Sequence, residues 1–281
     1  MEKGSLQKVY SWHDLPSIDL FGGAMIRTGF RGDGALLTFN RIKPTMKRWE
    51  PHSHPFDQVV LTVDGRQLLE VECEGMECGS GTIVRVPADV KHTGWPVGDQ
   101  TVLNIDIFAP PREDYLFLVE YQKEYAQPRK NADAMKIYHQ LPSEYSFSGK
   151  MMKDTSDVLY HWDDLPKFDL FDGDMKRAGF RGDHCLLVFN WIKPSMKRFE
   201  PHSHTFDQIV LTMEGRMMLE MDGKTMECGP RSIVRVPAGV MHTGWPLGDQ
   251  TVLNMDVFAP PREDYLFLVE YQKDYSAALK K

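Results

Sequence analysis

The chain has 281 residues, of which 42% are hydrophobic and 26% charged, as is usual for a folded protein with room for two domains. A formal net charge of −7 argues against a nucleic-acid or anionic-membrane partner. No apolar stretch approaches the roughly 18–20 residues of a membrane span, and the first residues lack the apolar core of a signal peptide. We therefore expect a cytoplasmic protein.

The chain is a tandem duplication. Residues 10–125 align with residues 160–275 without a gap, and 82 of the 116 aligned positions are identical. This period is much longer than the roughly 20–50 residues of a solenoid repeat, so each copy is a whole domain. The expected organisation is a first domain over residues 1–125, a linker over 126–158 and a second domain over 159–281.

Short β-rich runs dominate each copy. In the first copy they cover residues 35–42, 57–63, 66–72, 82–87 and 101–108, with turn residues between them. The sequence VDGR at residues 63–66 predicts a hairpin turn, and residues 111–125 predict a short helical segment after a proline pair. About ten short strands in such a domain favour a small antiparallel sandwich or barrel with room for one small ligand.

The four cysteines are Cys73, Cys78, Cys185 and Cys228. Only Cys78 and Cys228 occupy equivalent positions in the two copies, and no CxxC pair occurs. A disulfide framework usually repeats with its domain, so we expect reduced thiols.

A pair of histidines recurs at the same place in both copies, in EPHSHPFDQVV and EPHSHTFDQIV. If residues 52–62 form one strand, His52, His54 and Gln58 point into the barrel together with Val60. His92 follows in a turn between later strands. The equivalent side chains of the second copy are His202, His204, Gln208 and His242.

These motifs resemble those of the cupin superfamily. His52-Ser-His54 followed by Gln58 and Gly65 resembles the first cupin motif, and GTIVRVPADVKH resembles the second. The resemblance implies an all-β fold of two tandem cupin (double-stranded β-helix, or jelly-roll) barrels with short helical segments. It also implies one divalent metal ion per domain, either Ni, Fe, Zn or Mn. The implied ligands are His52, His54, Gln58 and His92, and His202, His204, Gln208 and His242.

A glutamine stands where most metal cupins have a glutamate. Three neutral imidazoles and an amide leave the full positive charge on a divalent ion, whereas a carboxylate would offset part of it. A more electrophilic ion polarises an oxygen ligand more strongly, which favours Lewis-acid chemistry over oxygen activation.

The last long strand of each copy carries a second set of candidate residues. Alternation in LNIDIFAPPRED places Asn104, Asp106 and Phe108 on one face, and the aspartate could move a proton near a polarised carbonyl. Arg112 could hold a substrate carboxylate in its fork. A structural ion pair between Asp106 and Arg112, with Phe108 in the core, is the alternative. The second copy repeats these positions as Asp256, Phe258 and Arg262.

Three other features allow more than one interpretation. Lys47 and Arg48 either attract an anionic substrate or are solvated charges. In the strand IVRVP, either Arg85 or the flanking valines point inward. Trp95 either stacks on a ligand ring or simply packs.

The aspartate, phenylalanine and arginine pattern resembles one cupin subgroup in particular, the KdgF-type enzymes that convert cyclic unsaturated uronates to linear sugars. In that subgroup the matching residues line the active site. The histidine and glutamine pattern also resembles the tandem-cupin isomerases of bacilysin biosynthesis, which share the duplicated architecture.

We therefore predict a metal-dependent isomerase or lyase of carbohydrate metabolism that acts on a small anionic substrate, without redox chemistry. Linearisation of an unsaturated uronate is the leading example. An iron-dependent dioxygenase that cleaves a diketone or flavonol is a second hypothesis, and a binding module without turnover is a third. A homodimer is compatible with the sequence, and neither nucleic acid nor membrane is expected as a partner.

Overall fold

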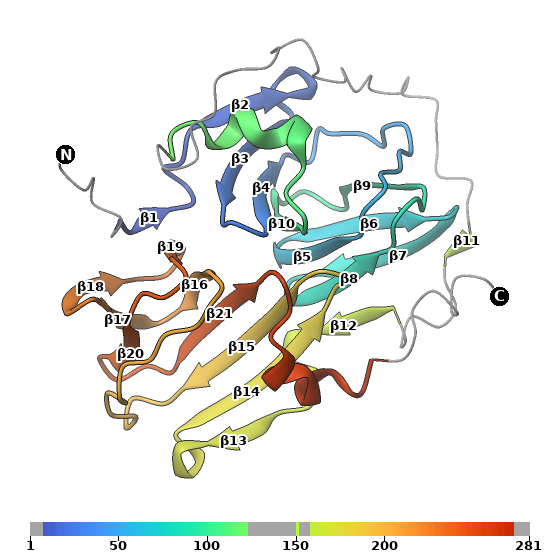
Figure 1. The fold of residues 1–281 in the computed structure, drawn as a ribbon. Coiled ribbons are helices and arrows are strands. Elements are labelled where there is room, and N and C mark those ends of the chain that lie inside the picture. Colours follow the sequence, from blue (N-terminus) through green and yellow to red (C-terminus); the bar gives the residue numbers. More distant parts are fainter. Residues whose placement is uncertain (1–7, 123–149, 152–157, 273–281) are drawn as a thin grey trace. The chain divides into compact units, whose positions relative to one another are not determined.

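The computed structural model of the chain describes residues 8–122, 150–151 and 158–272, and is nearly all β (Figure 1). Most of the predicted linker over residues 126–158 lies outside these ranges, as do residues 273–281 of the predicted second domain. Among the described helices, none has both the length and the apolar character needed to cross a bilayer.

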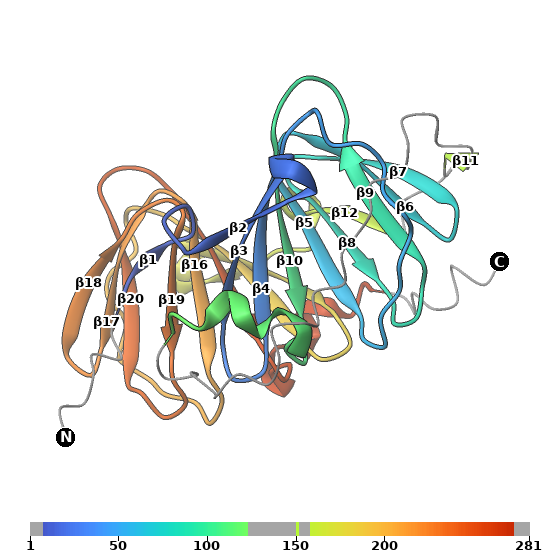
Figure 2. The same cartoon turned by 90° about the horizontal axis from the view of Figure 1, so that it is seen from above.

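The first barrel consists of a seven-stranded sheet in the order β12-β8-β5-β10-β4-β3-β2 and a four-stranded sheet in the order β11-β7-β6-β9 (Figure 2). All its pairings are antiparallel except that of β11 with β7. The strands are β2 (Ser17–Leu20), β3 (Met25–Arg31), β4 (Leu36–Ile42), β5 (Gln58–Asp64), β6 (Arg66–Val71), β7 (Glu74–Gly79), β8 (Thr82–Val86), β9 (His92–Pro96), β10 (Val102–Phe108), β11 (Lys150–Met151) and β12 (Leu159–His161).

The second barrel repeats this topology, with sheets in the orders β1-β19-β16-β21-β15-β14-β13 and β18-β17-β20. Its strands are β1 (Tyr10–Ser11), β13 (Phe168–Leu170), β14 (Met175–Arg181), β15 (Leu186–Ile192), β16 (Gln208–Glu214), β17 (Arg216–Met221), β18 (Lys224–Cys228), β19 (Ser232–Val236), β20 (His242–Leu247) and β21 (Val252–Phe258). The short helices described are the 3₁₀ segments η1 (Phe21–Gly23), η2 (Glu113–Val119), η5 (Trp162–Asp164), η6 (Phe171–Gly173) and η7 (Glu263–Val269). The predicted pair of all-β barrels with short helical segments is confirmed.

Each sequence copy gives its first strand to the other barrel. Strand β1 pairs with β19, with Tyr10 opposite Ile233, and β12 pairs with β8, with Tyr160 opposite Ile83 (Figure 1). The compact units of the chain consequently change at Leu15/Pro16 and at Asp164/Leu165. These positions differ from the boundaries at residues 125 and 159 that the repeat predicts, because the alignment groups each strand with its own copy and not with its partner strands.

The prediction of a hairpin at residues 63–66 is wrong. Strand β5 pairs with β8 and β10, whereas β6 pairs with β7 and β9, so the chain passes from one sheet to the other at this corner. Gly65 has a φ of +76°, and a Cβ there would lie 2.8 Å from the carbonyl oxygen of Thr101. The glycine is therefore needed for a tight corner and not for a two-strand hairpin.

The core of each barrel is built from alternate strand residues. Val60, Leu69, Val84 and Val86 belong to one buried cluster of the first barrel. Gln58 lies opposite Val86 across β5 and β8, so the valines share the face of the glutamine. This settles the orientation of IVRVP: the valines point inward, and Arg85 lies on the opposite face, where it pairs with the buried Asp57 at 3.2 Å.

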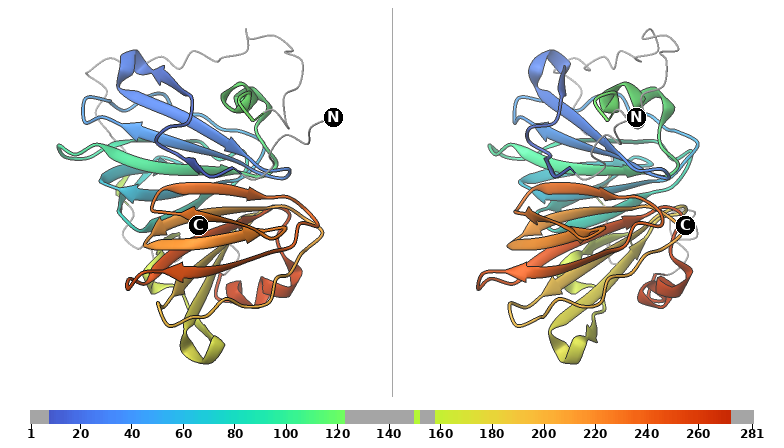
Figure 3. Two further views of the ribbon diagram at one scale, coloured as in Figure 1. Left: turned by 90° about the vertical axis from the view of Figure 1, so that its left-hand side faces the viewer. Right: turned by 60° about the vertical axis from the view of Figure 1, so that its left-hand side comes forward.

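The helical segment after the last strand is confirmed as a 3₁₀ helix that packs on the sheet. Helix η2 lies against β3 (Figure 3), where a Cβ on Gly29 would come within 2.8 Å of Leu118 Cβ. Gly179 has the same relationship to Leu268 in the second barrel. Glycine at these two positions allows the helix to close one side of each barrel.

The four cysteines are free, which confirms the expectation of reduced thiols. Cys73 is exposed, and the other three are buried. Burial raises the pKa of Cys78 to about 12 and that of Cys228 to about 11, so both thiols stay protonated at neutral pH.

Candidate metal centre

The paired histidines do not lie in a strand, contrary to the prediction for residues 52–62. Strand β5 begins only at Gln58, and His54 lies in the preceding loop. His52 forms an isolated bridge to His92, with N–H to O distances of 3.0 and 2.9 Å. Two prolines, Pro51 and Pro55, flank the pair and supply no backbone N–H, so a regular ladder cannot form here.

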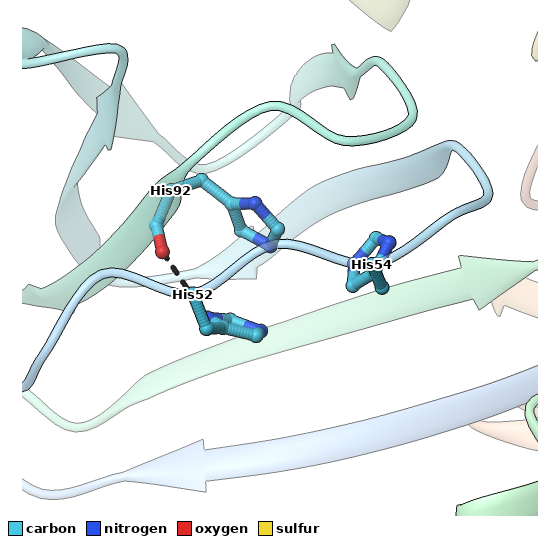
Figure 4. Close-up of side chains that lie close together, drawn as sticks. All are labelled: His52, His54 and His92. Atoms are coloured by element: carbon cyan, nitrogen blue, oxygen red, sulfur yellow. Dashed lines mark hydrogen bonds between the residues drawn. The ribbon is translucent and has the colours of Figure 1, made fainter.

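The three imidazoles of the first barrel nevertheless converge (Figure 4). One nitrogen from each of His52, His54 and His92 lies within 4.8 Å of the others. The ring centres of His52 and His54 are 4.3 and 4.9 Å from that of His92. His202, His204 and His242 form the same cluster in the second barrel. The histidines that the sequence singles out therefore come together in each barrel, although the local backbone that brings them together differs from the prediction.

Backbone carbonyls fix which nitrogen of each ring is free. The Nδ1 atoms of His52, His54 and His92 lie 3.1, 2.6 and 2.9 Å from carbonyl oxygens. A carbonyl only accepts, so Nδ1 carries the proton and Nε2 presents its lone pair. Such an outer hydrogen bond is typical of metal-binding histidine.

The Nε2 atoms of His92 and His242 are buried and have no hydrogen-bond partner within the described residues. A buried lone pair without a donor is costly unless a cation occupies the position that it faces. Burial, together with the neighbouring imidazoles, lowers the pKa of His52 to about 2, and burial lowers that of His92 and His242 to about 4. The rings are therefore neutral at physiological pH, which is the form that binds a metal.

Gln58 completes the donor set. Its Oε1 lies 3.1 Å from Nε2 of His54, and Gln208 stands at the same distance from His204. Since Nδ1 of His54 carries the proton, both atoms are acceptors, and a cation between them would relieve their repulsion. Three imidazoles and one amide oxygen suit a divalent transition metal ion, so the residues present fit the predicted cofactor.

A buried carboxylate lies next to this donor set. Asp106 accepts hydrogen bonds from Nδ2 of Asn40 at 2.9 Å and Nδ2 of Asn104 at 3.2 Å. Nε of Arg27 donates in turn to Oδ1 of Asn40 at 2.5 Å, which fixes the amide of Asn40. Burial raises the pKa of Asp106, while the charge of Arg27 and the hydrogen bond from Gln58 oppose the rise. The net effect is a raised pKa, because burial outweighs the opposing interactions.

The second barrel repeats this network. Arg177 donates to Asn190 at 2.7 Å, and Asn190 donates to Asp256 at 3.0 Å. Burial raises the pKa of Asp256, and the hydrogen bond from Gln208 opposes it.

Arg112 lines the site but is paired with a neighbour in sequence. Its guanidinium binds both oxygens of Asp114, at 3.1 and 2.6 Å, and lies 3.8 Å from the ring centre of Tyr115. Asp106 makes no ion pair with any described residue, so the alternative of an Asp106–Arg112 pair is wrong. Arg262 repeats the pairing with Asp264.

Phe108 is only 1% exposed and packs its ring at right angles to that of His54, with centres 5.9 Å apart. Phe258 makes the same contact with His204. Each phenylalanine therefore packs in the barrel core and also fixes the position of one imidazole of the histidine cluster.

A cavity of about 50 Å³ lies beside the first histidine cluster, with space for a few water-sized groups. Its walls include Asp106, Phe108 and Arg112, as the sequence predicts. Asn104, which alternation places on the face of Asp106, is also a wall residue. The polar and aromatic wall residues that sequence reasoning missed are Arg27, Asn40, Trp49, Gln67, Thr93 and Tyr115.

Two other predicted candidates lie elsewhere. Arg48 binds both carboxylate oxygens of the buried Glu70, at 2.8 and 2.9 Å, so it is a structural cation. Trp95 is not among the cavity walls, whereas Trp49 lies against His52 with ring centres 4.6 Å apart. Trp49, and not Trp95, is therefore the tryptophan beside the histidine cluster.

Comparison with known proteins gives one family and many structures. The model of the AraC-like ligand binding domain family matches residues 39–122 and 193–257, together more than half of the chain. No curated protein sequence matches the chain.

Among solved structures, AerE from Microcystis aeruginosa is 15% identical with a TM-score of 0.59, over 87% of this chain and 96% of that one. Oxalate decarboxylase from Lactobacillus farciminis, solved as a formate complex, is 12% identical with a TM-score of 0.63, over 90% and 86%. Oxalate decarboxylase from Bacillus subtilis, described with Mn(II) centres, is 13% identical with a TM-score of 0.60, over 89% and 76%. At these identities the similarity shows the shared fold of two tandem cupin barrels.

Proposed function

The chain belongs to the family of AraC-like ligand binding domains, and from this premise we propose that it is a metal-dependent tandem-cupin enzyme. Its reaction would be a non-redox isomerisation, tautomerisation or ring opening of a small unsaturated or oxo acid. Linearisation of an unsaturated uronate is the leading example.

The metal would be held by three Nε2 atoms and the amide oxygen of Gln58 in the first barrel, and by the equivalent atoms in the second. A divalent ion bound there supplies Lewis-acid polarisation of a substrate oxygen. Ni, Fe, Zn and Mn all accept this donor set, and the Mn(II) centres of the Bacillus subtilis oxalate decarboxylase favour testing manganese first.

Asp106 is the proposed proton carrier. It is buried, 6% exposed, and lines the same cavity as His52 and Gln58. A carboxyl group whose pKa is raised by burial exchanges protons at a pH nearer neutrality than an exposed one does. It can therefore take a proton from one carbon or oxygen of the substrate and return it to another.

Arg112 is proposed to orient the acid group of the substrate. Its guanidinium lines the cavity and is held against the ring of Tyr115. The bond to Asp114 fixes the plane of the guanidinium, so an incoming carboxylate meets a preorganised cation. The tandem repetition of this arrangement, with Arg262 and Asp264, supports a second site of the same kind.

The observation that carries this proposal recurs in each barrel. One buried Nε2 atom, that of His92 or of His242, has no hydrogen-bond partner among the described residues. A buried carboxylate, that of Asp106 or of Asp256, belongs to the same barrel and forms no ion pair with a described residue. Packing alone requires neither feature, because both cost free energy in a metal-free core.

The test is turnover of a panel of unsaturated uronates and oxo acids by the metal-loaded chain and by an Asp106→Asn/Asp256→Asn double variant. We expect kcat to fall by about two to four orders of magnitude while metal content is unchanged. Asp99→Asn/Asp249→Asn is the matched control, because these aspartates are exposed in equivalent loops. Equal turnover by both double variants, or none by the wild type, would contradict the proposal.

A binding module without turnover is the second candidate, and the family description as a ligand binding domain favours it. In that case the panel would contain ligands that bind to the metal-loaded chain and leave it chemically unchanged. The same assay therefore separates the two candidates, provided that ligand binding and product formation are measured on one sample.

A further inference from the structure

The two barrels differ at two of the positions that line the first cavity, Trp49 and Gln67. Gln67 on β6 is 2% exposed, and the equivalent residue in the second barrel is Met217, 4% exposed. The other wall residues of this cavity are identical in the second copy. Leu69 and Gly94 beside Gln67 correspond to Leu219 and Gly244 in the second barrel.

The amide of Gln67 has one end fixed. Its Nε2 donates to Oγ1 of Thr62 at 3.0 Å, and Thr62 is itself 1% exposed. No hydrogen bond to the other end, Oε1, is found among the described residues, and Gln67 forms part of the cavity wall. Oε1 is not one of the sealed polar atoms without a partner, so a ligand in the cavity can reach it and donate to it.

The second barrel shows the effect of losing this amide. Thr212, the equivalent of Thr62, has a buried hydroxyl without a partner in the described residues. Met217 belongs to the buried core of the second barrel, and its thioether is only a weak acceptor. The neighbouring aromatic residue also changes, from Trp49, whose Nε1 donates to the carbonyl of Gly94 at 3.0 Å, to Phe199.

We propose that Gln67 makes the first site selective for ligands that carry a hydroxyl group at this wall, and that Met217 leaves the second site selective for the less hydroxylated ligand. Within the proposed function, on which this inference rests for the identity of the ligands as small acids, the two sites would take different members of one substrate class. The first would take a hydroxylated oxo or unsaturated acid, and the second a deoxy or alkyl analogue.

The discrimination follows from what each wall can offer. In the first site a ligand hydroxyl replaces its bonds to water with a bond to Oε1 of Gln67, whereas an alkyl ligand leaves that oxygen unpaired. In the second site a hydroxyl loses its water without a strong partner at Met217. The proposed difference between the two sites thus rests on the amide of Gln67, for which Met217 offers no equivalent group.

The test uses the full chain loaded with Mn(II) and matched ligand pairs that differ by one hydroxyl. The pairs are hydroxypyruvate with pyruvate, and 4-hydroxy-2-oxobutanoate with 2-oxobutanoate. His242→Ala leaves metal only in the first site, and His92→Ala leaves it only in the second. The ratio of the two dissociation constants is measured by titration calorimetry for each site in turn.

In the first site we expect Gln67→Met to reduce the preference for the hydroxylated ligand by about three- to tenfold, the value of one neutral hydrogen bond. Met217→Gln should create a similar preference in the second site. Both variants exchange residues that the two barrels already accommodate, so they are expected to fold and to keep their metal. Thr62→Val removes the hydroxyl that holds the amide of Gln67. It should weaken the preference for the hydroxylated ligand, while the affinity for the alkyl ligand stays the same.

An affinity ratio that stays within twofold in Gln67→Met, or metal-loaded sites that bind none of the four acids, would overturn this inference. Its failure is distinct from a failure of the proposed enzyme. If the ligand preference depends on Gln67 but no substrate is turned over, this inference stands and the proposed enzyme activity is contradicted. If substrate is turned over but the preference does not depend on Gln67, the enzyme activity stands and this inference is contradicted.

Discussion

Gln58 lowers the pKa of the neighbouring Asp106, while its amide oxygen lies 3.1 Å from Nε2 of His54. One side chain thus connects the metal-facing nitrogen to the buried acid. A glutamate at this position would place a second carboxylate against Asp106 and would have no N–H to give it. The neighbouring Asp106 therefore explains why Gln58 stands where most metal cupins have a glutamate.

We expect Gln58→Glu/Gln208→Glu to destabilise the metal-free protein at pH 7 by about 1–3 kcal/mol, because two buried carboxylates meet where an amide donated. The measurement is urea unfolding of the metal-free chain. Adding Asp106→Asn/Asp256→Asn should restore most of the loss, because the new glutamate then receives a donor. If the glutamate substitutions destabilise the protein equally in the presence of Asp106 and Asp256 and in the Asn variants, the residue at position 58 is not coupled to Asp106.

Metal content offers a direct test of the two clusters. The wild type should bind two ions per chain, and His92→Ala or His242→Ala should bind one. His184→Ala is the control, because this histidine is exposed and has no counterpart in the first copy. A chelator should also lower the free energy of unfolding, by about 2.7 kcal/mol per site if the ion was present at a hundred times its dissociation constant. If either variant still binds two ions per chain, the assignment of that histidine as a metal ligand is wrong.

Arg112 was predicted to bind a substrate carboxylate, and its fork geometry gives a specific test. We expect Arg112→Lys/Arg262→Lys to lower kcat/KM by about ten- to hundredfold, because a lysine cannot make the paired bonds of a guanidinium. Metal content should not change. Arg66→Lys/Arg216→Lys is the matched control, since both arginines are exposed and pair with glutamates of their own barrels. A comparable loss in this control would point to a general effect of charge.

The thiols give a prediction about solvent access. Because burial raises the pKa of Cys78 and Cys228 to about 12 and about 11, very little thiolate forms at pH 8, and reagents also have no access. Only the exposed Cys73 should react with a thiol reagent in the native chain, and all four should react in denaturant. Cys73→Ser should abolish the native reaction. Rapid reaction of a second cysteine would show that the free energy of local opening of a barrel is low.

The ligand residues could be predicted from the sequence because the histidine spacing, the glutamine and a distant histidine recur in two copies. Their backbone could not, because strand alternation applied to residues 52–62 assumes a ladder that begins only at the glutamine in both copies, at Gln58 and at Gln208, although Thr205 replaces Pro55 in the second. The Asp106–Arg112 pair was a plausible alternative from proximity in sequence. The structure instead gives Arg112 a nearer carboxylate, Asp114, which follows in the first turn of η2.

The residues that sequence reasoning missed come from strands far apart in the chain. Arg27 and Asn40 lie on β3 and β4, and Tyr115 on η2, yet they join one network around Asp106 because the seven-stranded sheet brings β4 beside β10. No local motif marks them. The difference between Gln67 and Met217 is visible in the sequence as one of many changes between the copies, but only the cavity gives it a meaning.

The exchange of β1 and β12 has a consequence for how such a gene can be cut or shortened. A fragment that follows the repeat, ending after the first copy, would lose the strand that covers the edge of β8, and the complementary fragment would lose the one that covers β19. Bare strand edges recruit other chains. Half-length products should therefore associate with each other or with themselves, so that the smallest self-contained piece of this protein is the pair and not the single repeat.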